Sequence, residues 1–161
     1  MAALSAVDAL RLRAEIGNDL GQLARARDEV TSRAGATDQT TTYALALLLS
    51  NYYTGAEKLF KRMALPLGGL PPAGDRWHAQ LLEDMTIELP GVRPAALAPA
   101  TAEALADLLR FRHVVRNLYA WTVRRAEVDR LAAALPAAHE ALEHDIGRFL
   151  LFVDALAADG Q

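Results

Sequence analysis

The sequence predicts an all-α protein, an up-and-down helical bundle of about five helices. Apolar residues recur three or four positions apart through five segments, which is the spacing of one face of a helix. No stretch alternates apolar and polar residues, so no strand is expected. The connections between the five segments are short enough to join antiparallel neighbours, which favours the up-and-down arrangement.

The composition is that of a soluble globular chain, with 52% apolar and 23% charged residues. We expect residues 1–161 to form a single domain with a sizeable core. The chain has no cysteine, which excludes disulfides and thiolate metal sites. Residues 1–12 lack the pattern of a signal peptide, and the apolar run at 44–49 is too short to cross a bilayer. These observations predict a cytoplasmic protein.

The first two segments predict two long helices. Residues 4–33 carry an apolar stripe with charges on the outer side, and Gly35 is placed to end this helix. Thr37 and Asp38 are suitable N-caps for a second helix that runs to about Ala64. The middle of the second helix is apolar almost all round, so we expect it to be the most buried. Pro66 then stops it.

The remaining three segments are separated by Pro- and Gly-rich stretches. Asp75 is expected to cap a third, shorter helix. A fourth helix is expected to open at Pro99 and to run to about Glu127. A fifth begins near Val128, and Pro136 either kinks it or restarts it.

The expected fourth helix carries the residues that point to chemistry. At 100° per residue, Arg112, Arg116 and Tyr119 fall on one side, and His113 and Asn117 form a strip directly beside it. Guanidinium groups bind phosphate with a planar fork, and imidazole can move a proton near neutral pH. Six Arg between positions 110 and 130 make this part of the chain basic within a protein of net charge −3. A small RNA site needs such an excess, although a solvated Arg-rich face has the same composition.

A metal site on the last helix is a second possibility. Helical bundles that hold two irons use a Glu-x-x-His spacing. Here the spacing is Glu-x-x-x-His, and no second matching pair occurs. We therefore expect neither a metal nor a cofactor. The expectation is a solvated polar face made of His139, Glu140, Glu143 and His144. Two other positions stay open. At His78 a helix-surface histidine is expected, and a site residue is the alternative. Glu57 is either an exposed charge or a buried carboxylate reaching Lys or Arg.

The stretch FRHVVRNLYAW resembles the motif of HEPN ribonucleases, in particular of HepT-like toxins that pair with a nucleotidyltransferase antitoxin. In the HepT-like branch the motif reads Phe-Arg-His, two apolar residues, then Arg-His-x-Tyr. Two flanking segments, NYYTGAEKLFKRMA and GDRWHAQLLEDM, resemble the family's second-helix signature and its Trp-His segment. They occur in the same order along the chain. The motif residues that this chain reproduces are Phe111, Arg112, His113, Arg116 and Tyr119.

The resemblance implies a HEPN-like helical bundle that cleaves RNA without a metal, with Arg112 binding the phosphate and Arg116 assisting. It implies a homodimer whose two motifs face each other, and an antitoxin that adds AMP to the motif tyrosine, here Tyr119. The family's catalytic His is replaced by Asn117, which cannot exchange a proton near neutral pH. His113 would then act as the substitute acid-base, with Asn117 orienting the substrate. The alternative is a catalytically impaired HEPN module that binds RNA or a nucleotidyltransferase without cleavage.

Overall fold

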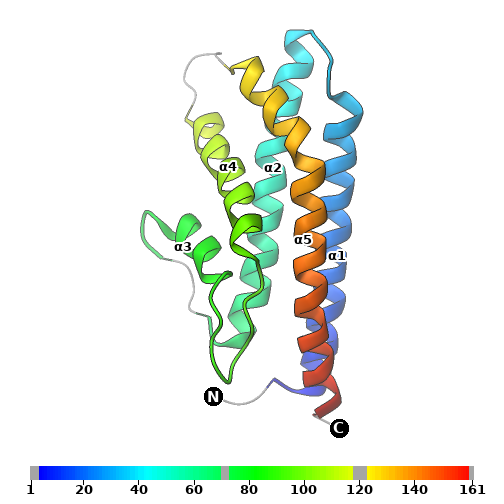
Figure 1. The fold of residues 1–161 in the computed structure, drawn as a ribbon, viewed down its shortest axis with the longest axis vertical. Helices are drawn as coiled ribbons and strands as arrows, with labels where there is room; N and C mark the ends of the chain where they lie inside the picture. Colours follow the sequence, from blue (N-terminus) through cyan, green and yellow to red (C-terminus); the bar gives the residue numbers. More distant parts are fainter. Residues whose placement is uncertain (1–3, 70–72, 118–122, 160–161) are drawn as a thin grey trace.

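A computed structural model describes residues 4–69, 73–117 and 123–159, and these residues form an all-α bundle, as predicted. Within them the only β-type pairing is an isolated bridge between Leu89 and Arg93. Four long helices run side by side, and a short one packs on the outside against α2 and α4 (Figure 1). The helices are α1 (Ala6–Arg33), α2 (Gln39–Ala64), the 3-10 turn η1 (Leu65–Leu67), α3 (Trp77–Asp84), α4 (Pro99–Arg116) and α5 (Arg125–Asp159).

The core is centred on α2, which contacts every other α-helix. Half of its 26 residues are buried, and Tyr52, Tyr53 and Phe60 have no exposed surface. The expectation that the second helix is the most buried is therefore confirmed. No helix in the described ranges combines the length and the hydrophobicity that a membrane span requires.

Local capping explains where the first helices begin and end. Asp38 caps α2 as predicted, because its carboxylate accepts a hydrogen bond of 2.8 Å from the backbone N–H of Thr41. That hydrogen bond also lowers the pKa of Asp38. The predicted cap of the third helix is wrong. The residue before α3 is Arg76, not Asp75, and no side chain caps this helix.

The boundary between the last two helices also differs from the prediction. We expected the fourth helix to run to Glu127, but α4 ends at Arg116 and α5 already begins at Arg125. The side-chain amide of Asn117 ends α4, because it donates a hydrogen bond to the backbone carbonyl of His113 in the last turn. The prediction considered only the spacing of apolar residues, which continues beyond this point. Tyr119 lies outside the described residues. Pro136 does not restart the helix, because α5 continues through it, and Figure 1 shows the first turns of α5 leaning away from the axis of the rest.

The start of α4 is fixed by a side chain from α5. Asp145 is 4% exposed, and its Oδ2 accepts a hydrogen bond of 2.8 Å from the backbone N–H of Ala98, the residue before the helix. Ala98 has no side-chain cap of its own, so Asp145 supplies the cap from another element. This contact sets the register of the helix that carries Arg112 and His113.

Candidate functional site

Three polar residues on α2 form one wall of the candidate site. Thr54, Glu57 and Lys61 are spaced at i, i+3 and i+7, so they share one face of the helix. Contacts from this face reach α3 and α4. Glu57 is 4% exposed, which shows that the carboxylate predicted as either buried or exposed is buried.

Arg112 is held on α4 against this wall. The residue is 5% exposed, and its Nε donates a hydrogen bond of 3.0 Å to Oγ1 of Thr54. The threonine hydroxyl in turn donates to the backbone carbonyl of Ser50 at 3.2 Å. Within the described chain, no acidic side chain pairs with Arg112, and its terminal amino groups make no hydrogen bond. A buried guanidinium without a counter-charge is costly, so this arrangement favours binding of an anion.

The six arginines of the basic stretch divide into two groups. Three are neutralised by neighbouring carboxylates in ion pairs at the surface: Arg110 with Asp107, Arg125 with Asp129, and Arg130 with Glu127 and Asp107. The other three form no ion pair in the part of the chain that the structure describes: Arg112, Arg116 and Arg124. The positive charge available to a ligand is thus concentrated near the end of α4 and the beginning of α5.

His113 is exposed beside Arg112, and it meets a histidine from another helix. Its ring stands edge-on to the ring of His78 on α3, with 5.5 Å between the ring centroids and 77° between the planes. The neighbouring helices still shield part of the His113 ring from water, and this desolvation lowers its pKa. The nearby His78 and Arg112 lower it further. The ring is therefore neutral at neutral pH, which is the form that accepts a proton.

His78 is fixed by the carboxylate of Glu57. Its Nδ1 contacts Oε2 of Glu57, and the side chain is 17% exposed. Trp77 stacks on the His78 ring at 3.7 Å between centroids, and the Lys61 ammonium lies 4.1 Å above the Trp77 ring. Lys61 Nζ is also 3.9 Å from the other carboxylate oxygen of Glu57. His78 is therefore mostly covered by its neighbours, so the expectation of a surface histidine is wrong.

A groove between α3 and α4 ends at His113. Its lining includes Ala79 and Glu83 from α3, and Ala106 and Arg110 from α4. The exposed imidazole therefore has an open approach along the surface. Chemically, the cluster offers a fixed cation, a neutral imidazole and a second imidazole oriented by a carboxylate.

The remaining predicted site residues lie at or beyond the end of α4. Arg116 is exposed in the last position of the helix. The Asn117 side chain is also exposed, and its Nδ2 donates a hydrogen bond of 2.8 Å to the backbone carbonyl of His113. Its amide group is thereby engaged in capping the helix. The structure thus brings Arg112 and His113 together with α2 and α3, while Asn117 faces its own helix.

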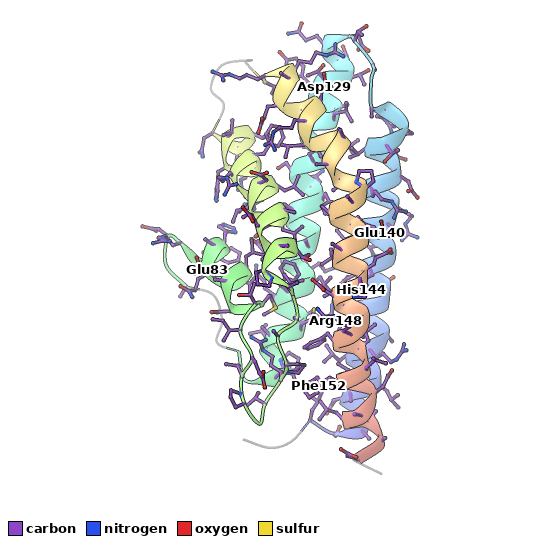
Figure 2. All side chains as sticks on the ribbon, in the orientation of Figure 1. Glu83, Asp129, Glu140, His144, Arg148 and Phe152 are labelled. Carbon is purple, nitrogen blue, oxygen red and sulfur yellow. The ribbon has the colours of Figure 1, made fainter. Side chains whose placement is uncertain are left out.

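The polar residues on α5 do not gather around a common point. Within the described ranges, no group of three or more His, Asp or Glu side chains is placed to hold a metal ion. The expected solvated face is wrong for His139, which is fully buried with its Nδ1 2.8 Å from the Tyr52 hydroxyl. The other three side chains are exposed: Glu140, Glu143 and His144. Figure 2 shows Glu140 and His144 on the α5 side of the bundle.

The sequence matches a known protein family. A family model described as HepT-like protein matches residues 44–153, which is more than half of the chain. The matched range includes most of α2 and all of α3 and α4, and with them Thr54, Glu57, His78, Arg112 and His113. Neither the curated proteins nor the solved structures gave a match.

Proposed function

The chain belongs to the HepT-like, HEPN-type protein family, and we propose that it is the toxin of a type II toxin–antitoxin pair, an endonuclease that cleaves RNA without a metal. The 2′-hydroxyl of the RNA attacks the neighbouring phosphorus atom. Arg112 binds the phosphate and stabilises the charge that develops on it, with Arg116 assisting. His113 transfers the proton. Asn117, whose Nδ2 caps α4, orients the substrate through its side-chain oxygen.

The observation that carries this proposal is the state of Arg112. Arg112 is 5% exposed, and its guanidinium is anchored by a hydrogen bond from Nε to Thr54. Arg110, two positions earlier, is exposed and paired with Asp107. Removing a cation from water without a counter-charge costs several kcal/mol. Arg93 is equally buried, but its guanidinium donates to three backbone carbonyls. Arg112 lies instead beside the exposed imidazole of His113, an arrangement that suits a phosphodiester.

Regulation is the second part of the proposal. The partner is a nucleotidyltransferase antitoxin that adds AMP to Tyr119, three residues beyond Arg116. A nucleotide there places negative charge and bulk where the RNA phosphate has to lie. We also propose a homodimer in which two copies of the α4 motif face each other and double the positive charge around the substrate.

The test is expression of the chain without its partner, followed by growth measurement and RNA cleavage assays on the purified protein. We expect Arg112→Ala to abolish growth arrest and to slow cleavage by about 10²-fold or more, since a lost electrostatic donor has this effect. Arg110→Ala is the matched control, because it removes an exposed, ion-paired arginine from the same helix and should retain activity. Equal behaviour of the wild type and Arg112→Ala rejects the nuclease assignment. Activity that persists in EDTA supports a metal-independent reaction.

A second candidate function rests on Asn117. The residue in the place of the family's histidine caps a helix and cannot transfer a proton, which favours a module that binds RNA or a nucleotidyltransferase without cleaving. The variant Asn117→His separates the two functions. A non-cleaving module gains cleavage on this substitution, whereas an enzyme that works through His113 changes little.

A further inference from the structure

We propose that His78, held by Glu57, is the general acid of this nuclease site and acts on the same phosphodiester as His113. This inference rests on the ribonuclease function proposed above. It adds a residue from α3 that lies 35 positions before His113 in the chain. The groups that carry it are Glu57 and Lys61 on α2, His78 on α3, and Arg112 and His113 on α4.

The reaction needs two proton transfers. When the 2′-oxygen forms its bond to phosphorus, the 2′-hydroxyl proton goes to a base. When the bond between phosphorus and the 5′-oxygen breaks, the leaving alkoxide takes a proton from an acid, and the products are a 2′,3′-cyclic phosphate and a 5′-hydroxyl. A single histidine serves both steps only by shuttling. Because Asn117 supplies no proton, the second group has to come from elsewhere in the site.

His78 is placed to supply it. The ring is held on one side by the buried Glu57 carboxylate at Nδ1 and on its face by Trp77, so its orientation is fixed. With 5.5 Å between the two ring centroids, both imidazoles can reach oxygens of one phosphodiester. Proton transfer needs hydrogen-bond distances of only about 2.6–3.2 Å.

The surroundings of the two rings assign their roles. His113 lies beside two cationic side chains, Arg112 and Arg116, and its lowered pKa keeps it neutral and able to accept a proton. His78 in its protonated form makes an ion pair with Glu57. The base is therefore His113 and the acid is His78, with Glu57 as the positioning residue and Lys61 nearby at 3.9 Å from the carboxylate.

The test compares two dinucleotide substrates. One has the natural 5′-oxygen leaving group, and the other has sulfur at this position, which leaves as a thiolate because thiols have a pKa of about 8.5. The thiolate needs no proton, so the second substrate bypasses the general acid. We expect His78→Gln to cleave the oxygen substrate about 10²–10⁴-fold more slowly and the sulfur substrate within a few-fold of wild type. His113→Gln is expected to be slow on both substrates.

Two further variants keep the test sharp. His144→Gln, an exposed histidine on α5, is the matched control and should cleave both substrates like the wild type. Glu57→Gln keeps an acceptor for Nδ1 but removes the charge. We expect it to slow cleavage of the oxygen substrate and to leave cleavage of the sulfur substrate nearly unchanged. Thermal melting of each variant checks the fold.

The outcomes separate the two proposals. The assignment of His78 is overturned if His78→Gln cleaves the oxygen substrate at the wild-type rate, or if it is equally slow on both substrates. The nuclease function stands in either case. Wild-type protein that cleaves neither substrate better than Arg112→Ala removes the proposed function and this inference together. If His78→Gln is slow on the oxygen substrate and near the wild-type rate on the sulfur substrate, His78 is the general acid.

Discussion

Replacing Asp145 with asparagine should destabilise the protein through the start of α4. The native carboxylate accepts a hydrogen bond from the Ala98 N–H with Oδ2 and contacts the Arg148 guanidinium with Oδ1 at 2.7 Å. Figure 2 shows Arg148 on the middle of α5. An amide of the same shape keeps one oxygen but turns an N–H toward one of these donors.

The size of the effect follows from which of these contacts is buried. A hydrogen bond to a charged group contributes about 1.5–3 kcal/mol when it is shielded from water, and the Ala98 N–H has no other cap. The Arg148 side chain is 57% exposed, so its pair with Asp145 adds at most about 1 kcal/mol. We expect a loss of roughly 2–3 kcal/mol, which lowers Tm by about 4–12 °C in a chain of this length.

The dependence on pH gives an independent check. Burial raises the pKa of Asp145, but hydrogen bonds from Thr101, the Ala98 N–H and Arg148 outweigh it and hold the pKa below the usual value. Asp145 therefore stabilises the fold above the pKa of an unfolded aspartate, about 3.9. This contribution is lost as the pH falls through the lower pKa of the folded state. The difference between the wild type and Asp145→Asn should be largest near neutral pH and should shrink in acid.

The assay is thermal and urea unfolding, followed by circular dichroism, across this pH range. Asp129→Asn is the matched control, since Asp129 is on the same helix but pairs with Arg125 at the surface (Figure 2). The control should change stability by no more than about 0.5 kcal/mol. An Asp145→Asn protein as stable as the wild type at pH 7, or a deficit that persists unchanged in acid, refutes the capping role.

Two further predictions concern other parts of the bundle. Burial lowers the pKa of His139, so the folded state keeps the ring neutral; stability should fall as the pH drops below about 6.5. Unfolding measured from pH 8 to 5 should show a smaller slope in His139→Gln than in the wild type, because His113, whose pKa is also lowered, contributes to both. At the end of α2, a Cβ on Gly69 would lie 2.7 Å from the backbone oxygen of Ala64, so Gly69→Ala should cost about 1–3 kcal/mol in urea unfolding. An unchanged urea midpoint would contradict this prediction, because it would mean that the turn accommodates the added Cβ with no loss of stability.

The sequence predicted those features that depend on local chemistry. The cap at Asp38, the stop after Ala64 and the start at Pro99 are each set by residues within a few positions, and the structure has them there. The end of α4 was missed because the helical spacing of apolar residues continues in the sequence beyond Asn117. The signal was Asn117 itself, since asparagine is a common residue at helix C-termini.

The partners of the site could not be predicted in the same way. Glu57 and His78 are 21 positions apart and meet only because α3 packs on both α2 and α4. Nothing in the spacing of either residue encodes that contact. His139 is different, because it continues the buried row Leu135, Leu142 and Ile146 on α5, and this apolar periodicity already indicated burial.

The most direct test of the central claim measures whether Arg112 binds an RNA phosphate. Affinity for a 2′-O-methyl RNA oligonucleotide, which cannot be cleaved, is titrated at several salt concentrations for the wild type, Arg112→Ala and Arg110→Ala. Each phosphate contact on single-stranded RNA contributes about 0.7 to the slope of log K against log salt. We predict weaker binding and a slope reduced by about this amount for Arg112→Ala only. The same affinity and slope in Arg112→Ala and the wild type would contradict the account.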